Sequence, residues 1–416
     1  MLASSAIREA RRAGIAAEAI VPVGSLRRFA PDVGDVTLLA LVPQSHHKQV
    51  LRAFGRLPIV AEVAAQTSGS ITISTSRGTI TLHLTPPEDA GAALVWHTGA
   101  LAHVRELQQR ALKIGVQLTD GRLLTPAGDP VPCAREEEFY ERLGLPLIPP
   151  ELREGNGEIA AAERGDIPPL LTELHIRGDL HMHSTWSDGR NSIADMVSAA
   201  KQIGYEYVAI TDHSEHAWSS RKLVPEDVPR QREEIEALRT RVHGIEILHG
   251  VEVDIMPDGS LDFDDELLSG FDLVLASLHD PAGQHDAELT ERYIRAINHP
   301  LVNIITHPAN RSPAQSSGYA VDFDQLFAAA ALTGTAMEID GAPGHLDMDG
   351  ALARRAAAAG VTIVVDSDCH RVDGLGRQMR FGVGTARRGW IEPRHVLNTR
   401  DASEVRAFVA RKRGSA

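Results

Sequence analysis

The sequence has few cysteines, few aromatic residues and no long apolar run. Its two cysteines, Cys133 and Cys369, are too few and too far apart for a disulfide framework, which favours a cytoplasmic protein. No apolar stretch reaches the length that crosses a membrane, and the segment from Met1 to Arg12 lacks the apolar core of a secretion signal. These absences predict a soluble globular protein with no membrane partner.

Positive charge is also scarce. The formal net charge of -14 argues against a protein that coats nucleic acid by electrostatics alone. A hydrophobic fraction of 43% allows a large core, and 416 residues exceed one ordinary domain, so two or three domains are expected. Nineteen histidines, many of them inside short motifs, point to local chemistry.

The densest such motif runs from Gly178 to Gly189. His181 and His183 lie two apart at the end of an apolar-leaning run, and Asp188 follows in a Ser-Asp-Gly turn. In a strand, residues i and i+2 point to the same side, so the two histidines can bind one metal ion together. The turn can bring the Asp188 carboxylate over the same opening. This stretch predicts a metal centre.

From residue 177 onward, short apolar strands alternate with helices. The strands are expected at 207–211, 245–251, 273–277, 304–306, 336–339 and 361–365, and the helices at 192–203, 229–242, 288–297, 322–331 and 350–359. About seven β–α units predict an α/β fold, a closed parallel barrel with its active site at the C-terminal strand ends.

Six strand ends, counting the run that ends at His181 and His183, carry a residue type that binds metals. The candidates are His181, His183, Asp188, His213, Glu252, His279, His307, Asp368 and His370. A single histidine is usually structural, but such a series favours a metal site, and mixed nitrogen and oxygen donors suit Zn, Mn or Fe. His216, His243 and His249 fit the pattern less well, and Cys369 is interpreted as a packing residue.

The N-terminal part predicts a small α+β unit. A helix is expected over residues 1–20, a buried strand within 32–42, and two further strands around Ser76 to Gly78. The turn at Gly24 and Ser25 opens a helix and can present N–H groups to phosphate. Helical spacing continues over 94–114 and 136–143, and the glycines and prolines of 151–176 suggest a linker.

Two stretches of this part resemble the family X DNA polymerases. Gly24 to Arg28 followed by Val33-Gly34-Asp35 is similar to their palm, a nucleotidyltransferase fold with three metal-binding carboxylates. Only Asp35 matches, because Thr37 and Thr81 stand where the other two are expected, and a hydroxyl is a poor substitute. The sequence also starts just before the palm, so synthesis is expected to be lost.

The resemblance extends to a thumb. Gly91 to Leu94, His97 to Gly99 and Gly144 to Glu154 look like the thumb of bacterial family X enzymes, although a small helical packing domain is the simpler interpretation. The expected organisation is a degenerate palm at 1–85, a thumb-like subdomain at 86–150, a linker at 151–176 and a metal-dependent domain at 177–416.

Residues 177 to about 400 resemble the polymerase and histidinol phosphatase (PHP) superfamily, of the kind found at the C-terminus of bacterial family X polymerases. The resemblance implies a distorted (β/α)7 barrel with up to three divalent metal ions (Mn, Zn or Fe). One ion would take His181, His183, Glu252 and Asp368, which are the expected catalytic set. A second would take His279 and His307 with Glu252 as a bridge, and a third Asp188, His213 and His370.

Such a centre predicts hydrolysis of a phosphoester by a metal-activated hydroxide. The family association suggests DNA 3′ ends as the substrate, through 3′→5′ exonuclease or 3′-end processing activity. Arg311 follows His307-Pro308 as in that family, and Arg380 and Arg387 lie in a stretch that resembles the end of those polymerases, so these arginines are candidates for phosphate contacts. The loops 215–222, 280–284 and 312–317 depart from the family pattern.

Three alternatives stay open. The first is a small-molecule phosphatase that acts on histidinol phosphate or a nucleotide monophosphate. The second is a non-catalytic DNA-repair adaptor whose barrel uses metals structurally, with closed coordination shells. The third is a surviving polymerase. Products from an oligonucleotide, a mononucleotide and gapped DNA would separate them.

Overall fold

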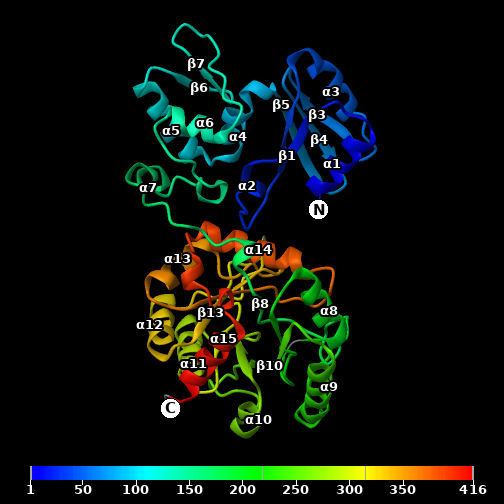
Figure 1. Ribbon diagram of the computed structural model, residues 1–416, viewed down its shortest axis with the longest axis vertical. Coiled ribbons are helices and arrows are strands. Elements are labelled where there is room, and N and C mark those ends of the chain that lie inside the picture. The colour runs from blue at the N-terminus through cyan, green and yellow to red at the C-terminus, as the bar shows by residue number, and fades with distance from the viewer. Residues whose placement is uncertain (1, 218, 314, 415–416) are drawn as a thin grey trace. The chain divides into compact units, whose positions relative to one another are not determined.

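Backbone contacts divide the chain into two units in the computed structural model, residues 1–168 and 169–416 (Figure 1). The structure describes residues 2–217, 219–313 and 315–414, so Met1, Trp218, Ala314 and residues 415–416 lie outside it. The loops expected at 215–222 and 312–317 are therefore described only in part. The division falls inside the segment 151–176, which also carries helix α7 (Glu158–Arg164).

A five-stranded sheet forms the first part of unit 1, in the order β1-β2-β5-β4-β3. Its strands are β1 (Ala19–Pro22), β2 (Val36–Leu41), β3 (Glu62–Gln66), β4 (Ser70–Thr75) and β5 (Gly78–Thr85). Helices α1 (Leu2–Arg12) and α3 (His47–Phe54) pack on one face through Ala6, Val50 and Phe54. The helix expected over 1–20 is too long, because the chain turns at Gly14 (φ 66°) and β1 begins at Ala19.

The second part of unit 1 is mainly helical. It contains α2 (Gly24–Arg27), α4 (Ala90–Thr98), α5 (Leu101–Lys113), α6 (Glu136–Arg142) and a hairpin of β6 (Gln117–Thr119) and β7 (Arg122–Leu124). The helix expected over 94–114 is two helices, because Gly99 is extended and a Cβ there would lie 2.9 Å from His103. Buried His103 joins three helices through Glu158 (2.6 Å) and Tyr140 (3.0 Å).

Unit 2 is a nearly closed barrel of seven parallel strands in sequential order from β8 to β14. They are β8 (Gly178–Asp179), β9 (Tyr207–Ile210), β10 (Glu246–Asp254), β11 (Leu273–Ser277), β12 (Ile304–Ile305), β13 (Ala336–Asp340) and β14 (Ile363–Asp366). The six expected strands are confirmed to within three residues at each end. The α/β barrel predicted from the β–α alternation is therefore confirmed.

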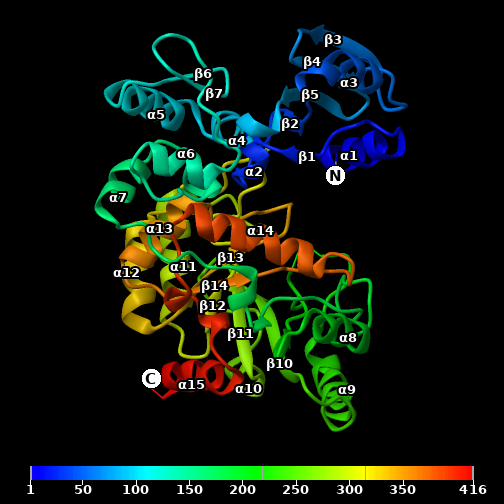
Figure 2. The same ribbon diagram turned by 45° about the horizontal axis from the view of Figure 1, so that its top comes forward.

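Helices surround these strands, as Figure 2 shows. They are α8 (Ile193–Ile203), α9 (Val228–Arg241), α10 (Asp265–Ser269), α11 (Asp286–Asn298), α12 (Phe323–Thr333), α13 (Gly350–Ala358), α14 (Leu375–Arg388) and α15 (Ala402–Arg413). The five expected helices are confirmed. No helix in the described part of the chain is long and apolar enough to cross a membrane.

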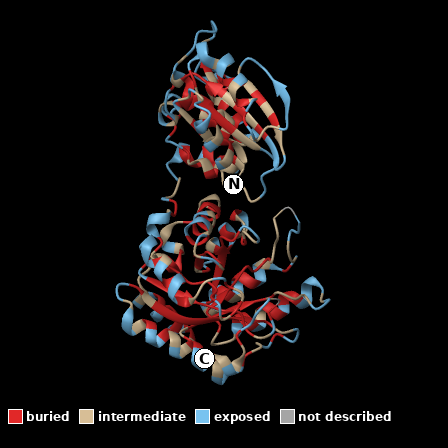
Figure 3. Ribbon diagram, turned by 90° about the vertical axis from the view of Figure 1, so that its right-hand side faces the viewer, coloured by how far each residue is buried: buried red, intermediate tan, exposed pale blue. Residues whose placement is uncertain are grey.

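Alternation along the strands produces two apolar layers around the barrel wall. Leu273 and Leu275 of β11 join an inner cluster that also receives Phe408 of α15, whereas Val274 and Ala276 join the larger cluster against the outer helices. Figure 3 shows the strands of unit 2 as its buried centre. The interior is thus apolar at the end where α15 packs.

The seam between β8 and β14 is closed by side chains. Asn398 donates from Nδ2 to the carbonyl oxygens of Gly178 (2.9 Å) and Val365 (2.6 Å), and Asp366 accepts the N–H of Leu180 (2.8 Å). Beyond the strands, Met182 and Cys369 form a parallel bridge. The seam therefore places the residues after β8 beside those after β14.

Candidate metal centre

The barrel strands deliver the predicted ligands to one end of the sheet. His181 and His183 follow β8, Glu252 lies near the end of β10, and Asp368 follows β14. His183 donates its N–H to the carbonyl of Cys369 (3.0 Å) across the seam, which fixes its backbone. His307 and Asp368 have positive φ angles of 28° and 46°, a conformation that is uncommon for residues other than glycine.

The first group joins both sides of the seam. The Nε2 atoms of His181 and His183 lie 3.1 Å apart, and the Nε2 of His183 lies 3.0 Å from Oδ1 of Asp368. Oε2 of Glu252 lies 3.4 Å from the Nε2 of His181. His181, His183 and Glu252 are fully buried. These four side chains therefore direct donor atoms at one small volume.

The second group lies at the more open edge. Oδ1 of Asp188 lies 3.1 Å from the Nε2 of His370 and 3.7 Å from the Nε2 of His213. The rings of His213 and His370 both stack on His183, with centroids 4.2 Å away. The His370 side chain is 32% exposed, which makes this edge the solvent side of the site.

The third group is centred on Glu252. Its Oε1 lies 3.0 Å from the Nε2 of His307 and 3.8 Å from that of His279, and its Oε2 lies 2.7 Å from Nδ1 of His213. Glu252 thus contacts all three groups. The structure brings together all nine predicted ligands, named here the histidine–carboxylate cluster: His181, His183, Asp188, His213, Glu252, His279, His307, Asp368 and His370.

The cluster fits divalent metal ions by its unsatisfied donors. Asp188 Oδ1, His213 Nδ1 and Glu252 Oε2 are buried, yet none forms a hydrogen bond within the described residues. His213 Nδ1 and Glu252 Oε2 are only 2.7 Å apart without hydrogen-bond geometry, so both point at a common space. Buried polar atoms are costly when unpaired, and a bound cation would satisfy them.

The cluster contains both neutral and charged imidazoles. Burial lowers the pKa of His183 to about 3, and the neighbouring His370 and His213 act in the same direction. Burial would also lower the pKa of His370, but Asp368 and Asp188 raise it to about 9. For His279, contact with Asp254 and the charge of Glu252 outweigh burial and raise the pKa to about 9. Metal ions would therefore have to displace protons from His279 and His370 at neutral pH.

The sequence analysis missed the residue that orients His181. Glu338, inside β13, accepts from Nδ1 of His181 at 2.7 Å and from the backbone N–H of His307 at 2.8 Å. A proton on Nδ1 leaves the Nε2 lone pair of His181 directed at the cluster, which is how outer carboxylates usually serve metal-binding histidines. The available signal was an acidic residue at every second position of an apolar strand, Glu338 and Asp340.

Two further buried carboxylates support the cluster. Both carboxylate oxygens of Asp254 lie 3.1 Å from Nδ1 of His279. Asp212 accepts from the hydroxyls of Ser184 and Ser187 at 2.6 Å each, which shapes the turn that carries Asp188. Asp212 was visible beside His213 in the sequence, but its role depends on the fold of that turn.

The three arginines proposed for phosphate contacts lie in different surroundings. Arg311 is half-buried after His307, and its backbone N–H donates to Asp347 at 3.2 Å. Arg387 donates to the carbonyl of Leu171 at 2.9 Å, and Arg380 lies 3.8 Å from Glu173. The last two contacts link α14 to the segment before β8, and a role of the three arginines in phosphate binding stays a prediction.

In unit 1, the structure aligns the residues that replace the expected polymerase carboxylates. Thr37 and Thr81 are register partners on β2 and β5, and Thr37 donates to Asp35 at 3.2 Å. Arg28, in the motif after Gly24, donates to Glu154 (2.8 Å) and to the carbonyl of Thr98 (2.6 Å). The three residues that the sequence analysis compares with the polymerase carboxylates therefore provide one carboxylate and two hydroxyls.

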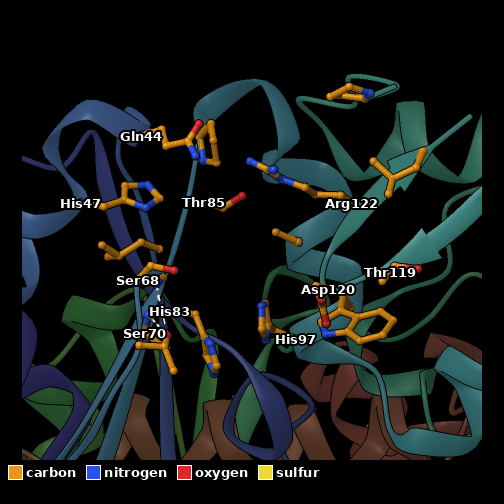
Figure 4. Close-up of a pocket in the computed structure, with 18 of the residues that line it drawn as sticks. Gln44, His47, Ser68, Ser70, His83, Thr85, His97, Thr119, Asp120 and Arg122 are labelled. Carbon is orange, nitrogen blue, oxygen red and sulfur yellow. Dashed lines mark hydrogen bonds between the residues drawn. The ribbon is translucent and has the colours of Figure 1, made fainter. Parts of the chain in front are cut away.

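A pocket of about 1000 Å³ lies beside these strands in unit 1 (Figure 4). Its walls carry His83 and His97, whose rings stack with centroids 4.1 Å apart, and Arg122. Asp120 is the only carboxylate residue among its described lining residues. The pocket therefore lacks the acid pair that would bind two catalytic metals.

Comparisons with known proteins match both units. The model of the PHP domain matches residues 179–308, and that of the DNA polymerase beta thumb matches residues 93–154. The chain is 36% identical over 392 residues to the DNA polymerase/3′-5′ exonuclease PolX of Bacillus subtilis (strain 168), covering 93% of this chain and 68% of that protein. It is 33% identical over 223 residues to a probable phosphatase of Shewanella oneidensis, covering 50% of this chain and 79% of that protein. A probable phosphatase of Thermoanaerobacter sp. (strain X514) is 29% identical over 255 residues, covering 56% of this chain and 95% of that protein.

Proposed function

The chain belongs to the PolX family and carries a metal-dependent PHP phosphoesterase, and from that premise we propose that it processes DNA 3′ ends as a 3′→5′ exonuclease. We further propose that its polymerase activity is lost. The observation that carries the first proposal is the convergence of nine donor side chains with unpaired buried atoms at the barrel end. The proposal of a DNA substrate is supported by the similarity to PolX of Bacillus subtilis, whose name describes a DNA polymerase and 3′-5′ exonuclease.

The proposed metal ligands are the members of the histidine–carboxylate cluster. Bound divalent ions would lower the pKa of a water molecule and neutralise phosphoryl oxygens. Glu252 directs one oxygen to His307 and the other to His213, so it is positioned to bridge two ions. The Asp188 and His370 side chains are 21% and 32% exposed, which makes their edge the proposed entrance for the phosphoester.

Loss of synthesis is supported by the chemistry of unit 1. Palm (1–85), thumb (86–150) and linker (151–176) remain our assignments for its segments. The hydroxyls of Thr37 and Thr81 cannot supply the charge of two carboxylates, and Arg28 is occupied by Glu154. Failure to incorporate a labelled nucleotide on gapped DNA is the expected result, and incorporation that disappears in Asp35→Ala would refute this proposal.

The test of hydrolysis uses metal-free protein reloaded separately with Mn and with Zn. Three substrates are compared, namely a 5′-labelled single-stranded oligonucleotide, a 3′-phosphorylated oligonucleotide and a mononucleotide. His183→Ala is the inactive variant, and His299→Gln is the matched control because His299 precedes β12, at the opposite end of the barrel strands. A ladder that shortens from the 3′ end in wild type and His299→Gln, but not in His183→Ala, supports the exonuclease.

A small-molecule phosphatase is the second candidate, favoured by the similarity to two probable phosphatases and by the net charge of -14. Phosphate release from the mononucleotide, with both oligonucleotides intact, would select it and refute the exonuclease. Silence on all three substrates with metals bound would refute both and favour the adaptor alternative.

A further inference from the structure

A further donor cluster combines Asp368 with two residues that are not among the nine predicted ligands. Asp340 ends β13, His345 lies in the loop that follows, and one donor atom from each of Asp340, His345 and Asp368 lies within 4.8 Å of the others. Two carboxylates with one imidazole form a donor set that suits Mn, Fe or Zn. The three residues come from neighbouring strand ends of the same barrel.

Asp340, a member of this cluster, has one buried oxygen without a hydrogen-bond partner among the described residues. The side chain is fully buried, and its Oδ1 accepts the N–H of Ala342 at 2.6 Å. Its Oδ2 forms no hydrogen bond within the described part of the chain. Burial of a carboxylate oxygen without a partner is unfavourable, so a cation or a proton is required there.

His345 is held in place for such a role. Its ring stacks on His307 with centroids 5.0 Å apart and an angle of 18° between the planes. Its Nδ1 is buried and, among the residues that the structure describes, has no hydrogen-bond partner. The stacking fixes the ring plane, and the nitrogen lone pair is left for a ligand.

The charges around Asp340 favour a cation. A donor atom of Asp368 lies within 4.8 Å of one of Asp340, and Glu338 lies two residues earlier on the same strand, so carboxylates of the same charge surround this position. Like charges that share a buried site cannot all stay ionised without a positive partner. A divalent ion supplies that charge and at the same time satisfies Asp340 Oδ2 and His345 Nδ1.

We propose that Asp340, His345 and Asp368 form a fourth divalent-cation site, with Asp368 shared between this site and the His181–His183 group. The proposal rests on the proposed function, because Asp368 is also a ligand there. The alternative occupant is a proton shared between Asp340 and Asp368, which binds no metal and therefore gives a different result in the test.

The first test counts manganese ions that stay bound per chain after desalting. Wild type and His299→Gln are expected to retain one ion more than Asp340→Asn and one more than His345→Ala. Because His345 lies in a partly exposed loop, His345→Ala keeps the test valid if the buried Asp340→Asn fails to fold. Equal counts in wild type and folded variants would overturn the fourth site.

The second test locates the ions by anomalous scattering from crystals of the manganese-loaded protein. A peak among Asp340, His345 and Asp368 supports the proposal. Peaks at the other three groups without one here would overturn the fourth site alone and leave the proposed function intact. Absence of every peak, together with absence of metal-dependent hydrolysis, would overturn both.

Discussion

Replacement of Glu338 by glutamine tests whether metal binding depends on a residue that touches no ion. Glu338 is fully buried, accepts from Nδ1 of His181 at 2.7 Å and accepts from the N–H of His307 at 2.8 Å. Glutamine keeps the size and one acceptor oxygen but removes the negative charge. Burial would lower the pKa of His181, but Glu338, Glu252 and Asp368 raise it well above its ordinary value.

Two effects of the change oppose each other. Without Glu338, His181 loses its proton more easily, which favours metal binding, but the ring also loses basicity and orientation. Loss of the outer partner of a metal-binding histidine typically costs about 10–100-fold in affinity, or about 1.4–2.7 kcal/mol. We expect that cost to dominate at high pH, where fewer protons compete with the metal.

The assay is the apparent Kd for Mn or Zn, measured against a competing chelator at pH 7 and above pH 9. Glu234→Gln is the matched control, since Glu234 lies on the outer helix α9 and accepts a hydrogen bond from the indole N–H of Trp186. Thermal unfolding of the metal-free proteins separates loss of fold from loss of affinity. Unchanged affinity in a folded Glu338→Gln protein would refute the orientation argument.

Four further predictions follow from the structure. Metal affinity should rise between pH 7 and 9, because the pKa values of His279 and His370 are raised to about 9 and their protons must leave when metal binds. Calorimetry in buffers of different ionisation enthalpy should detect this proton release. A metal affinity that does not change between pH 7 and 9 would contradict the prediction. Removal of metal should abolish hydrolysis and lower the Tm, and ions at 100 times their Kd should stabilise the fold by about 2.7 kcal/mol; an unchanged Tm after chelation would count against binding to the folded state. Asn398→Ala should cost about 2–4 kcal/mol in urea unfolding, because the carbonyls of Gly178 and Val365 lose their donor; a cost below about 0.5 kcal/mol would show that water replaces the amide. Gly91→Ala should destabilise unit 1 by about 1–3 kcal/mol, since a Cβ there would lie 2.1 Å from the carbonyl oxygen of Arg135. Hydrolysis by the barrel should persist in this variant. An unchanged midpoint of urea unfolding would contradict the steric clash.

The barrel was predictable because its strands are buried on both sides and therefore form continuous apolar runs. Strand β11 was placed at its observed bounds, 273–277. Strand β3 was missed because all five of its residues are exposed, so it carries no alternation of buried and exposed positions. Helix α14 was also missed, since it contains Gly376, Gly382 and Gly384, and glycine disfavours helices.

Those glycines serve packing that no local pattern reveals. A Cβ on Gly382 would lie 2.8 Å from Val365 of β14, so the helix can approach the barrel only without a side chain there. The proximity of the nine ligand candidates followed from one rule, that parallel strands end on the same side. This rule did not identify the role of Glu338, because its partners, His181 and the backbone of His307, are distant in the sequence.

The seam between β8 and β14 gives the metal centre a second consequence. His183 and Asp368, on opposite sides of the seam, are 185 positions apart in the chain. An ion bound by both residues would act as a reversible cross-link that closes a loop of nearly the whole barrel sequence. Closure of a long loop restricts the unfolded ensemble more strongly than closure of a short one. Availability of metal would then control how often the first and last strands separate, and amide exchange at Leu180 and Val365 would report it.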